Sequence, residues 1–279
     1  MSRIIRSPEK QKAHKKKMRL LSVAVFLCVG AFVWLVIYIP SLSSLQIKNI
    51  VVRGNKVLTE DEIKKKLGEE LSGKYLYLFP KTNIFLYPRE ALQKDLLAAF
   101  PRIANLSVSL DAKRTLTVSL VEREPFALWC GPEITEPEAD DACFYLDESG
   151  FVFAHAPHFS GNAYFKFYGK GNMPAGDPAG HDFLSLVSYR HILKVKEELE
   201  SFGVHPVKIF VEEDGGAFLT EAGGYGIRFN LDQDISSLKS NMQAVFRSSS
   251  WGGIATSGAL EYLDFRFGNK VYYKYRNKE

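Results

Sequence analysis

Residues 20–39 read LLSVAVFLCVGAFVWLVIYI, and this stretch decides how the rest of the chain is organised. It contains no charged residue, and thirteen of its residues are Leu, Ile, Val or Phe. A helix of about 20 residues spans roughly 30 Å, the thickness of the hydrocarbon core of a bilayer. Inserting those thirteen side chains gains on the order of 4–8 kcal/mol. The sequence therefore predicts a transmembrane helix over residues 20–39.

Residues 1–19 form a short basic tail. They hold eight Lys and Arg residues and one acid, Glu9, whereas the rest of the chain carries 28 basic and 31 acidic residues. The excess of positive charge therefore belongs to the tail and does not indicate a nucleic-acid-binding surface. A basic segment beside an apolar span stays in the cytoplasm. We expect a single-pass protein of the cell membrane with residues 1–19 cytoplasmic and its C-terminal domains extracytoplasmic.

The alternative for the apolar stretch is a signal peptide that is removed. Ser41-Leu42-Ser43 is a small-x-small sequence in a plausible cleavage position. However, the apolar run is longer than the 7–15 residues of a typical signal-peptide core. We therefore expect the span to be retained as a membrane anchor.

Residues 45–122 have the pattern of a small α/β domain. The segment 46–57 is rich in β-branched residues, and Thr59 and Glu62 have the spacing of a helix capping box. A second helix follows Pro88, and residues 106–110 and 116–120 alternate apolar and polar side chains. This β-α-α-β-β order predicts a small sheet with both helices on one face. The aromatic connector, residues 75–85, either contacts lipid headgroups or fills a gap beside the sheet, and we expect packing.

Residues 123–279 predict a larger, mixed β domain with two helices. One helix is expected over residues 183–202, a second follows Asp234, and two strands close the chain at 260–267 and 271–275. The fold class is therefore α+β. Cys130 and Cys143 bracket an acidic loop whose flanks read as strand ends, so these cysteines could form a disulfide across the base of a hairpin. Two free thiols are the alternative.

Candidate sites for chemistry are weak throughout the sequence. His155 and His158 lack further ligands at the spacing of a zinc site, and the acidic loop between the two cysteines lacks the EF-hand pattern. The glycines of residues 169–176 do not form a dinucleotide-binding fingerprint, and no nucleophile elbow is present. We therefore expect no catalytic residue, no metal, no cofactor and no enzymatic activity.

Four stretches of the sequence resemble the FtsQ/DivIB family of bitopic cell-division proteins. They are IKNIVVRGN at 47–55, VEREPFALW at 121–129, YLDESGFVF at 145–153 and LEYLDFRF at 260–267. The resemblance implies a POTRA-like domain next to the membrane at 45–122 and an FtsQ/DivIB-type β domain at 123–279. It also implies a non-enzymatic scaffold of the divisome at the division septum. Such a scaffold connects FtsB/DivIC-type and FtsL-type partners to the septal peptidoglycan synthase.

The strand expected at 271–275 offers a physical route to partner binding. If it pairs on one side only, its free backbone groups can accept a strand from another protein. In FtsQ the partner docks near the matching C-terminal strands, so the resemblance implies binding roles for Tyr262, Asp264, Arg266, Phe267, Asn269, Val271 and Tyr273. Alternating aromatics can also be core residues, and Asp264 with Arg266 can be an ordinary surface pair, so both interpretations stay open.

Two other functions compete with the division scaffold. One is a POTRA-bearing transport or assembly component, although that class usually carries several POTRA copies or a membrane β-barrel. The other is a membrane-tethered cell-wall enzyme whose site has no recognisable motif.

Overall fold

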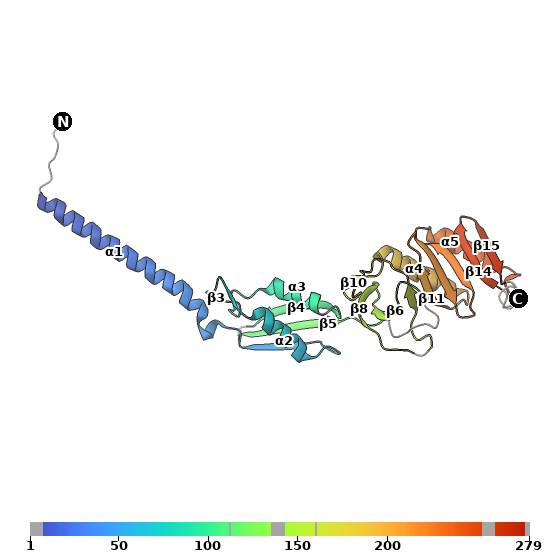
Figure 1. The fold of residues 1–279 in the computed structure, drawn as a ribbon, viewed down its shortest axis with the longest axis horizontal. Coiled ribbons are helices and arrows are strands. Elements are labelled where there is room, and N and C mark those ends of the chain that lie inside the picture. The colour runs from blue at the N-terminus through green and yellow to red at the C-terminus, as the bar shows by residue number, and fades with distance from the viewer. Residues whose placement is uncertain (1–7, 112, 135–142, 160, 253–259, 277–279) are drawn as a thin grey trace, which may run out of the picture. The chain divides into compact units, whose positions relative to one another are not determined.

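The computed structural model describes residues 8–111, 113–134, 143–159, 161–252 and 260–276 (Figure 1). These residues fall into two compact units, of which the first comprises Met1–Ala99 with Asn105–Glu122 and the second comprises Phe100–Ala104 with Arg123–Glu279. The acidic residues Glu136, Glu138, Asp140 and Asp141 of the loop between the two cysteines lie outside the described residues.

The first unit begins with a long helix, α1 (Pro8–Tyr38), followed by two short 3-10 turns, η1 (Ile39–Ser41) and η2 (Ser43–Leu45). The segment Lys15–Ser41 is long and apolar enough to cross a membrane, and an 18-residue window within it has a mean hydropathy of 2.8. The helix begins well before Leu20, because Lys, Arg and Gln are good helix formers. The basic segment is therefore helical from Pro8 onward and continuous with the apolar span.

The rest of the first unit is an α/β domain in which two helices accompany a three-stranded sheet. Its strands lie in the order β1-β5-β4, and β1 runs parallel to β5. Apolar side chains on one face of each helix and of the central strand are buried, among them Leu67, Leu92 and Leu116. The elements are β1 (Asn49–Arg53), α2 (Glu60–Leu71), β2 (Lys74–Tyr75), β3 (Phe79–Pro80), α3 (Arg89–Ala99), β4 (Ile103–Leu110) and β5 (Thr115–Glu122). The expected β-α-α-β-β order is present, and β2 with β3 adds a small hairpin.

Helix α2 begins where the capping box predicts it. The Thr59 hydroxyl accepts the backbone N–H of Glu62 at 3.3 Å, and the Glu62 carboxylate accepts the backbone N–H of Thr59 at 2.9 Å. These reciprocal bonds satisfy two donors that a helix N-terminus otherwise leaves unpaired. The sequence pattern thus fixes the first turn of α2.

The connection from β1 to α2 is held by the carboxylate of Glu122, at the end of β5. This buried group accepts the backbone N–H groups of Lys56 at 2.6 Å, Val57 at 3.0 Å and Leu58 at 3.0 Å. Gly54 precedes them with a φ of +86°, and a Cβ added there would lie 2.1 Å from the carbonyl oxygen of Leu120. Only glycine fits this close approach, so Gly54 and Glu122 together set the path of the turn.

The second unit is built on one sheet of ten strands in the order β10-β8-β7-β6-β9-β11-β12-β13-β14-β15 (Figure 1). Helices α4 and α5 share one core with strand residues such as Phe167, Phe229 and Phe265, all fully buried. The elements are β6 (Ala127–Trp129), β7 (Phe144–Leu146), β8 (Phe151–His155), β9 (Lys166–Tyr168), β10 (His181–Asp182), α4 (Leu186–Ser201), β11 (Pro206–Val211), β12 (Gly216–Glu221), β13 (Gly226–Asn230), α5 (Ile235–Phe246), β14 (Leu260–Phe267) and β15 (Lys270–Tyr275). The predicted α+β class and the two helices are confirmed.

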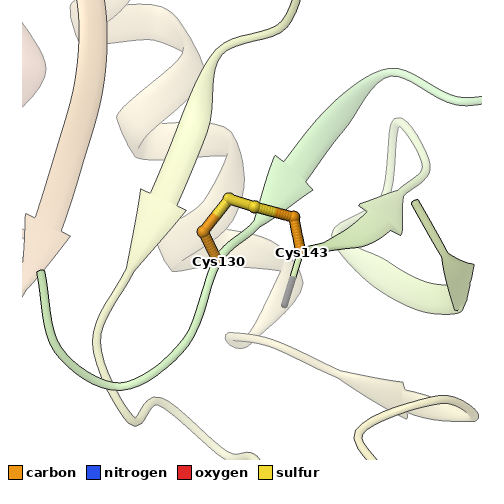
Figure 2. The surroundings of a disulfide bond; sticks show 2 residues. All are labelled: Cys130 and Cys143. Carbon is orange, nitrogen blue, oxygen red and sulfur yellow. A yellow bond between two sulfur atoms is a disulfide. The ribbon is translucent and has the colours of Figure 1, made fainter. Parts of the chain in front are cut away.

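A disulfide joins Cys130, just after β6, to Cys143, just before β7 (Figure 2). The antiparallel partners Trp129 and Phe144 bring the two cysteines face to face at the end of the hairpin. Closing a loop of this length stabilises the fold by about 3 kcal/mol in the chain-entropy model. Because such bonds persist in oxidising compartments, the disulfide fits a domain that lies outside the cytoplasm.

Asp147 holds the tight turn between β7 and β8. One of its carboxylate oxygens accepts the backbone N–H and the hydroxyl of Ser149, at 2.8 and 2.6 Å, and the backbone N–H of Phe151 at 3.1 Å. The other oxygen pairs with Arg123. Burial favours a higher pKa for Asp147, but the hydrogen bonds from Ser149, Phe151 and Arg123 outweigh it and lower the pKa below its ordinary value.

We expect Asp147→Asn to lower the free energy of unfolding by about 1–2 kcal/mol at pH 7, because the amide weakens the bonds to Arg123 and the turn. The pKa of Asp147 is lower in the folded than in the unfolded chain. Its contribution is therefore present above about pH 4 and is lost as the pH falls through the folded-state pKa. Urea unfolding at pH 7 and at pH 3 measures the free energy of unfolding of the variant and of the wild type. The difference between the two proteins should be smaller at pH 3. Glu148→Gln, a neighbouring exposed position, is the control; an Asp147→Asn deficit of equal size at both pH values would contradict this role.

Candidate functional site

Strand β15 forms one edge of the ten-stranded sheet and lies at the red end of the chain in Figure 1. Within the part of the chain that the structure describes, its only ladder partner is β14, with Leu263 opposite Tyr273 and Asp264 opposite Tyr272. The other side of β15 therefore presents backbone N–H and C=O groups to which a further strand can pair. This edge is the candidate site, and we call it the β15 edge.

The two faces of the sheet differ at this edge. Side chains of a strand alternate between faces, so cross-strand partners share a face. One row runs through Leu219, Ile227, Leu263 and Tyr273 and is continuous with the core beneath the helices. The other row runs through Phe218, Arg228, Asp264 and Tyr272. Tyr272 and Tyr273 thus flank the same edge from opposite faces.

The seven residues implied by the family resemblance all lie in β14, β15 or the turn between them, but their exposure differs. Phe267 is 53% exposed, Tyr273 is 56% exposed, and Asn269 is exposed in the turn. Val271 is half-buried and packs against the core, whereas Asp264 is only 4% exposed. The arrangement therefore offers Phe267, Asn269 and Tyr273 for direct contact, and it gives Asp264 a supporting position.

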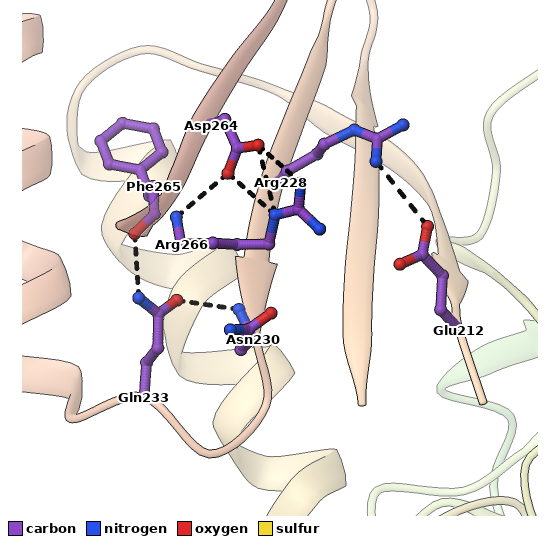
Figure 3. A network of polar contacts seen from close by, with 7 residues as sticks. All are labelled: Glu212, Arg228, Asn230, Gln233, Asp264, Phe265 and Arg266. Carbon is purple, nitrogen blue, oxygen red and sulfur yellow. Dashed lines mark hydrogen bonds and ion pairs between the residues drawn. The ribbon is translucent and has the colours of Figure 1, made fainter. Parts of the chain in front are cut away.

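Asp264 is the centre of a polar network on the face opposite the helices (Figure 3). Its carboxylate accepts Nη2 of Arg266 at 2.7 Å, Nε of Arg266 at 2.9 Å and the backbone N–H of Arg266 at 3.1 Å. Burial favours a higher pKa for Asp264, but the bonds from Arg266 outweigh it and hold the pKa below its ordinary value. Asp264 is therefore ionised at neutral pH and fixes the Arg266 side chain over β14.

Gln233 ties this network to the segment between β13 and α5 (Figure 3). Its Nε2 donates to the backbone carbonyl of Phe265 at 2.9 Å, and its Oε1 accepts the backbone N–H of Asn230 at 2.8 Å. One amide thus bridges the end of β13 to β14, two strands that pair in parallel. The bridge fixes β14, which in turn positions β15.

Arg228, next to the network, lies among aromatic rings. Its guanidinium carbon is 5.0 Å from the ring centre of Phe218 and 5.4 Å from that of Tyr262, and its Nη1 is 3.9 Å from Oε1 of Glu212. The Arg228 Nε is buried and has no hydrogen-bond partner among the described residues. Arginine and tyrosine are enriched at the energetic centres of protein interfaces. This surface therefore has the composition of a polypeptide-binding site.

Sequence reasoning missed three residues of this surface, Arg228, Tyr272 and Tyr275. The Phe267 and Tyr272 rings lie 5.1 Å apart and nearly perpendicular, and Tyr275 contacts Tyr273 in the same way at 5.4 Å. The alternation in KVYYKY signals that Tyr272 and Tyr273 point to opposite faces, which would have identified Tyr272. No local signal links Arg228 to β14, because their pairing depends on the tertiary fold.

The structure also locates His155, one of the two histidines considered as metal ligands from the sequence. His155 ends β8, and its ring packs edge-on against Phe144 at 5.2 Å. Among the described residues, no group of three or more His, Cys, Asp or Glu side chains could hold a metal ion.

Comparison with known proteins points to one family. Residues 45–123 match the family model described as POTRA domain, FtsQ-type. The curated "Cell division protein FtsQ" of Mycobacteroides abscessus is 27% identical over 138 residues, which are 50% of this chain and 38% of that protein. The match thus spans well under two thirds of the relative's length. The chain thus contains a POTRA domain of the FtsQ type and is similar to a cell-division FtsQ protein over half of its length.

Proposed function

We propose that this chain is a non-enzymatic, single-pass membrane scaffold of the bacterial divisome. It links FtsB/DivIC-type and FtsL-type bitopic partners to septal peptidoglycan synthesis at the division septum. The apolar part of α1 supplies the anchor, and the basic residues that precede it keep the N-terminus in the cytoplasm. The disulfide between Cys130 and Cys143 supports an extracytoplasmic second unit.

The observation that carries this proposal is the β15 edge. A partner segment adds to β15 as an eleventh strand, and its backbone bonds supply affinity. Phe267 and Tyr273 flank the added strand with exposed aromatic surface, and Asn269 lies at its end. Asp264, Arg266, Tyr262 and Val271 act indirectly, because they hold β14 and β15 in place.

We expect Tyr273→Asp and Phe267→Ala each to weaken partner binding about tenfold or more, since exposed aromatics at an interface contribute roughly 1–2 kcal/mol or more. The full-length chain in nanodiscs is titrated with the extracytoplasmic segment of its cognate FtsB/DivIC-type partner, and the dissociation constant is measured by biolayer interferometry. Thermal melting of each variant shows that the fold is kept.

Val187→Asp provides the matched control, because Val187 is an exposed apolar residue on α4, away from β14 and β15. Its affinity should equal that of the wild type. Wild-type affinity in both edge variants, or an equal loss in Val187→Asp, would refute the β15 edge as the docking site.

A further inference from the structure

The turn between β2 and β3 contains two residues of types that rarely adopt its backbone conformation. Leu78 donates its N–H to the carbonyl of Tyr75 at 3.0 Å, and the central residues Leu76 and Tyr77 have φ values of 49° and 63°. A turn with two left-handed central residues normally uses Asn-Gly or Asp-Gly, because side chains with a Cβ are strained there. Strain of this kind points to a role for the side chains themselves.

Those side chains are also exposed, although they are apolar. Leu76 is 80% exposed, Tyr77 is 93% exposed, and Phe85 just beyond the hairpin is 78% exposed. The sequence-based expectation that this connector packs beside the sheet is wrong for these three residues. Large apolar side chains that are exposed on neighbouring stretches of the chain are candidates for an interaction surface. We call Leu76, Tyr77 and Phe85 the hairpin tip.

The segment that carries the hairpin tip is tied to the chain just after α1. The buried amide of Asn83 donates to the carbonyl of Pro40 at 2.8 Å, and Ile84 donates its N–H to the carbonyl of Leu45 at 2.9 Å. Gln46 donates to the same Pro40 carbonyl at 2.8 Å. Strand β3 also contacts η1, which follows directly on α1. These bonds fix the segment next to Phe85 beside the residues that follow the anchor helix, and strand β3 leads from this segment back to Leu76 and Tyr77.

The chemistry of the hairpin tip fits a lipid surface. Tyrosine and other amphipathic aromatics concentrate at the level of the headgroups, where the ring is apolar and the hydroxyl is hydrated. Lys74 is exposed at the base of the same hairpin, so its ammonium can reach phosphate groups while its stem lies along apolar surface. The tie to Pro40 and Leu45 places these groups beside the bilayer that α1 crosses.

We propose that Leu76, Tyr77 and Phe85 insert into the interface of that bilayer as a second, shallow anchor that holds the POTRA domain against the membrane. This inference rests on the proposed membrane-spanning role of α1. The ligand is the lipid surface itself, and the strained turn is retained because it presents two adjacent apolar side chains outward.

The test uses the full-length chain in phosphatidylcholine–phosphatidylglycerol vesicles. In a Cys28→Ser background, Tyr77→Cys is labelled with an environment-sensitive NBD fluorophore, while Cys130 and Cys143 are protected by their disulfide. We expect blue-shifted emission and quenching by lipids spin-labelled near the headgroup. The matched control is Val57→Cys, at 64% exposure and at the opposite end of the sheet, beside Glu122; it should show water-like emission without quenching. Equal signals at 57 and 77 would overturn the proposal.

A second variant separates the side chains from the turn. Leu76→Asn combined with Tyr77→Gly supplies the residues that the turn prefers, so its melting temperature should equal or exceed that of the wild type. A label at Phe85→Cys should nevertheless lose its quenching in this variant. Retained quenching would contradict insertion through Leu76 and Tyr77.

A label on the native Cys28 tests separately whether α1 spans the bilayer. Quenching of the Cys28 label by lipids spin-labelled in the acyl chain confirms that α1 is inserted. An unquenched Tyr77→Cys label would then refute only the insertion of the hairpin tip. An unquenched Cys28 would refute both the membrane span and the proposal that depends on it.

Discussion

Replacing Glu122 with alanine is expected to destabilise the POTRA domain by about 3–5 kcal/mol, because each hydrogen bond to a charged acceptor contributes roughly 1.5–3 kcal/mol net and water partly replaces the lost acceptor in the variant. The change leaves the N–H groups of Lys56, Val57 and Leu58 without their carboxylate. A loss of this size is a large part of the stability of a typical domain. Urea unfolding of the full-length chain in detergent, followed by circular dichroism, measures it.

Glu122→Gln is the matched variant, because it keeps one carbonyl oxygen of similar reach and removes the charge. We expect its free energy of unfolding to lie between those of the wild type and of Glu122→Ala. Glu90→Ala, at an exposed position in the first turn of α3, controls for the loss of an acidic residue and should change stability little. If Glu122→Ala were no more costly than Glu90→Ala, the carboxylate would not hold the β1–α2 connection.

The second large effect is expected from Asp264→Ala, which should lower the free energy of unfolding of the second unit by about 2–4 kcal/mol. Breaking a buried ion pair costs roughly 3–5 kcal/mol, and the partial exposure of Arg266 reduces this cost. The variant leaves the Arg266 guanidinium without its main acceptor and removes one of the two negative charges beside Arg228, which keeps Glu212. Urea unfolding at pH 7 measures the change.

A double-mutant cycle with Arg266→Ala tests whether the two side chains act as a pair. The double variant should lose less stability than the sum of the two single losses, because it contains neither unpaired charge. Strictly additive losses would contradict the pairing. The cycle also bears on partner binding. If Asp264→Ala binds the partner more weakly, the cause would be a disturbed β14 rather than the loss of a direct contact.

The sequence predicts those features whose signals are local. Twenty uncharged residues are enough to predict the anchor, and Thr59 with Glu62 is enough to predict the start of α2. The resemblance to FtsQ/DivIB, which depends on short stretches in both domains, is confirmed by the match over residues 45–123 and by the curated relative.

The remaining features depend on pairing between distant segments. Alternation identifies β13 and β14 as strands, but it does not reveal that they pair in parallel or that ten strands join in one sheet. A charged residue such as Asp264 is expected at the surface, and its burial depends on Arg266 and on the neighbouring strand. The β2–β3 turn lacks the Asn-Gly pair that would mark it, so the sequence gives no warning of the hairpin.

The parallel pairing of β1 with β5 determines how far apart the chain enters and leaves the POTRA domain. Because the first and last strands of the POTRA domain run in the same direction, the polypeptide enters at one end of the domain and leaves at the other. The eight residues of β5 extend over about 26 Å at roughly 3.3 Å per residue. The polypeptide therefore leaves the POTRA domain about one strand length away from the point where it enters.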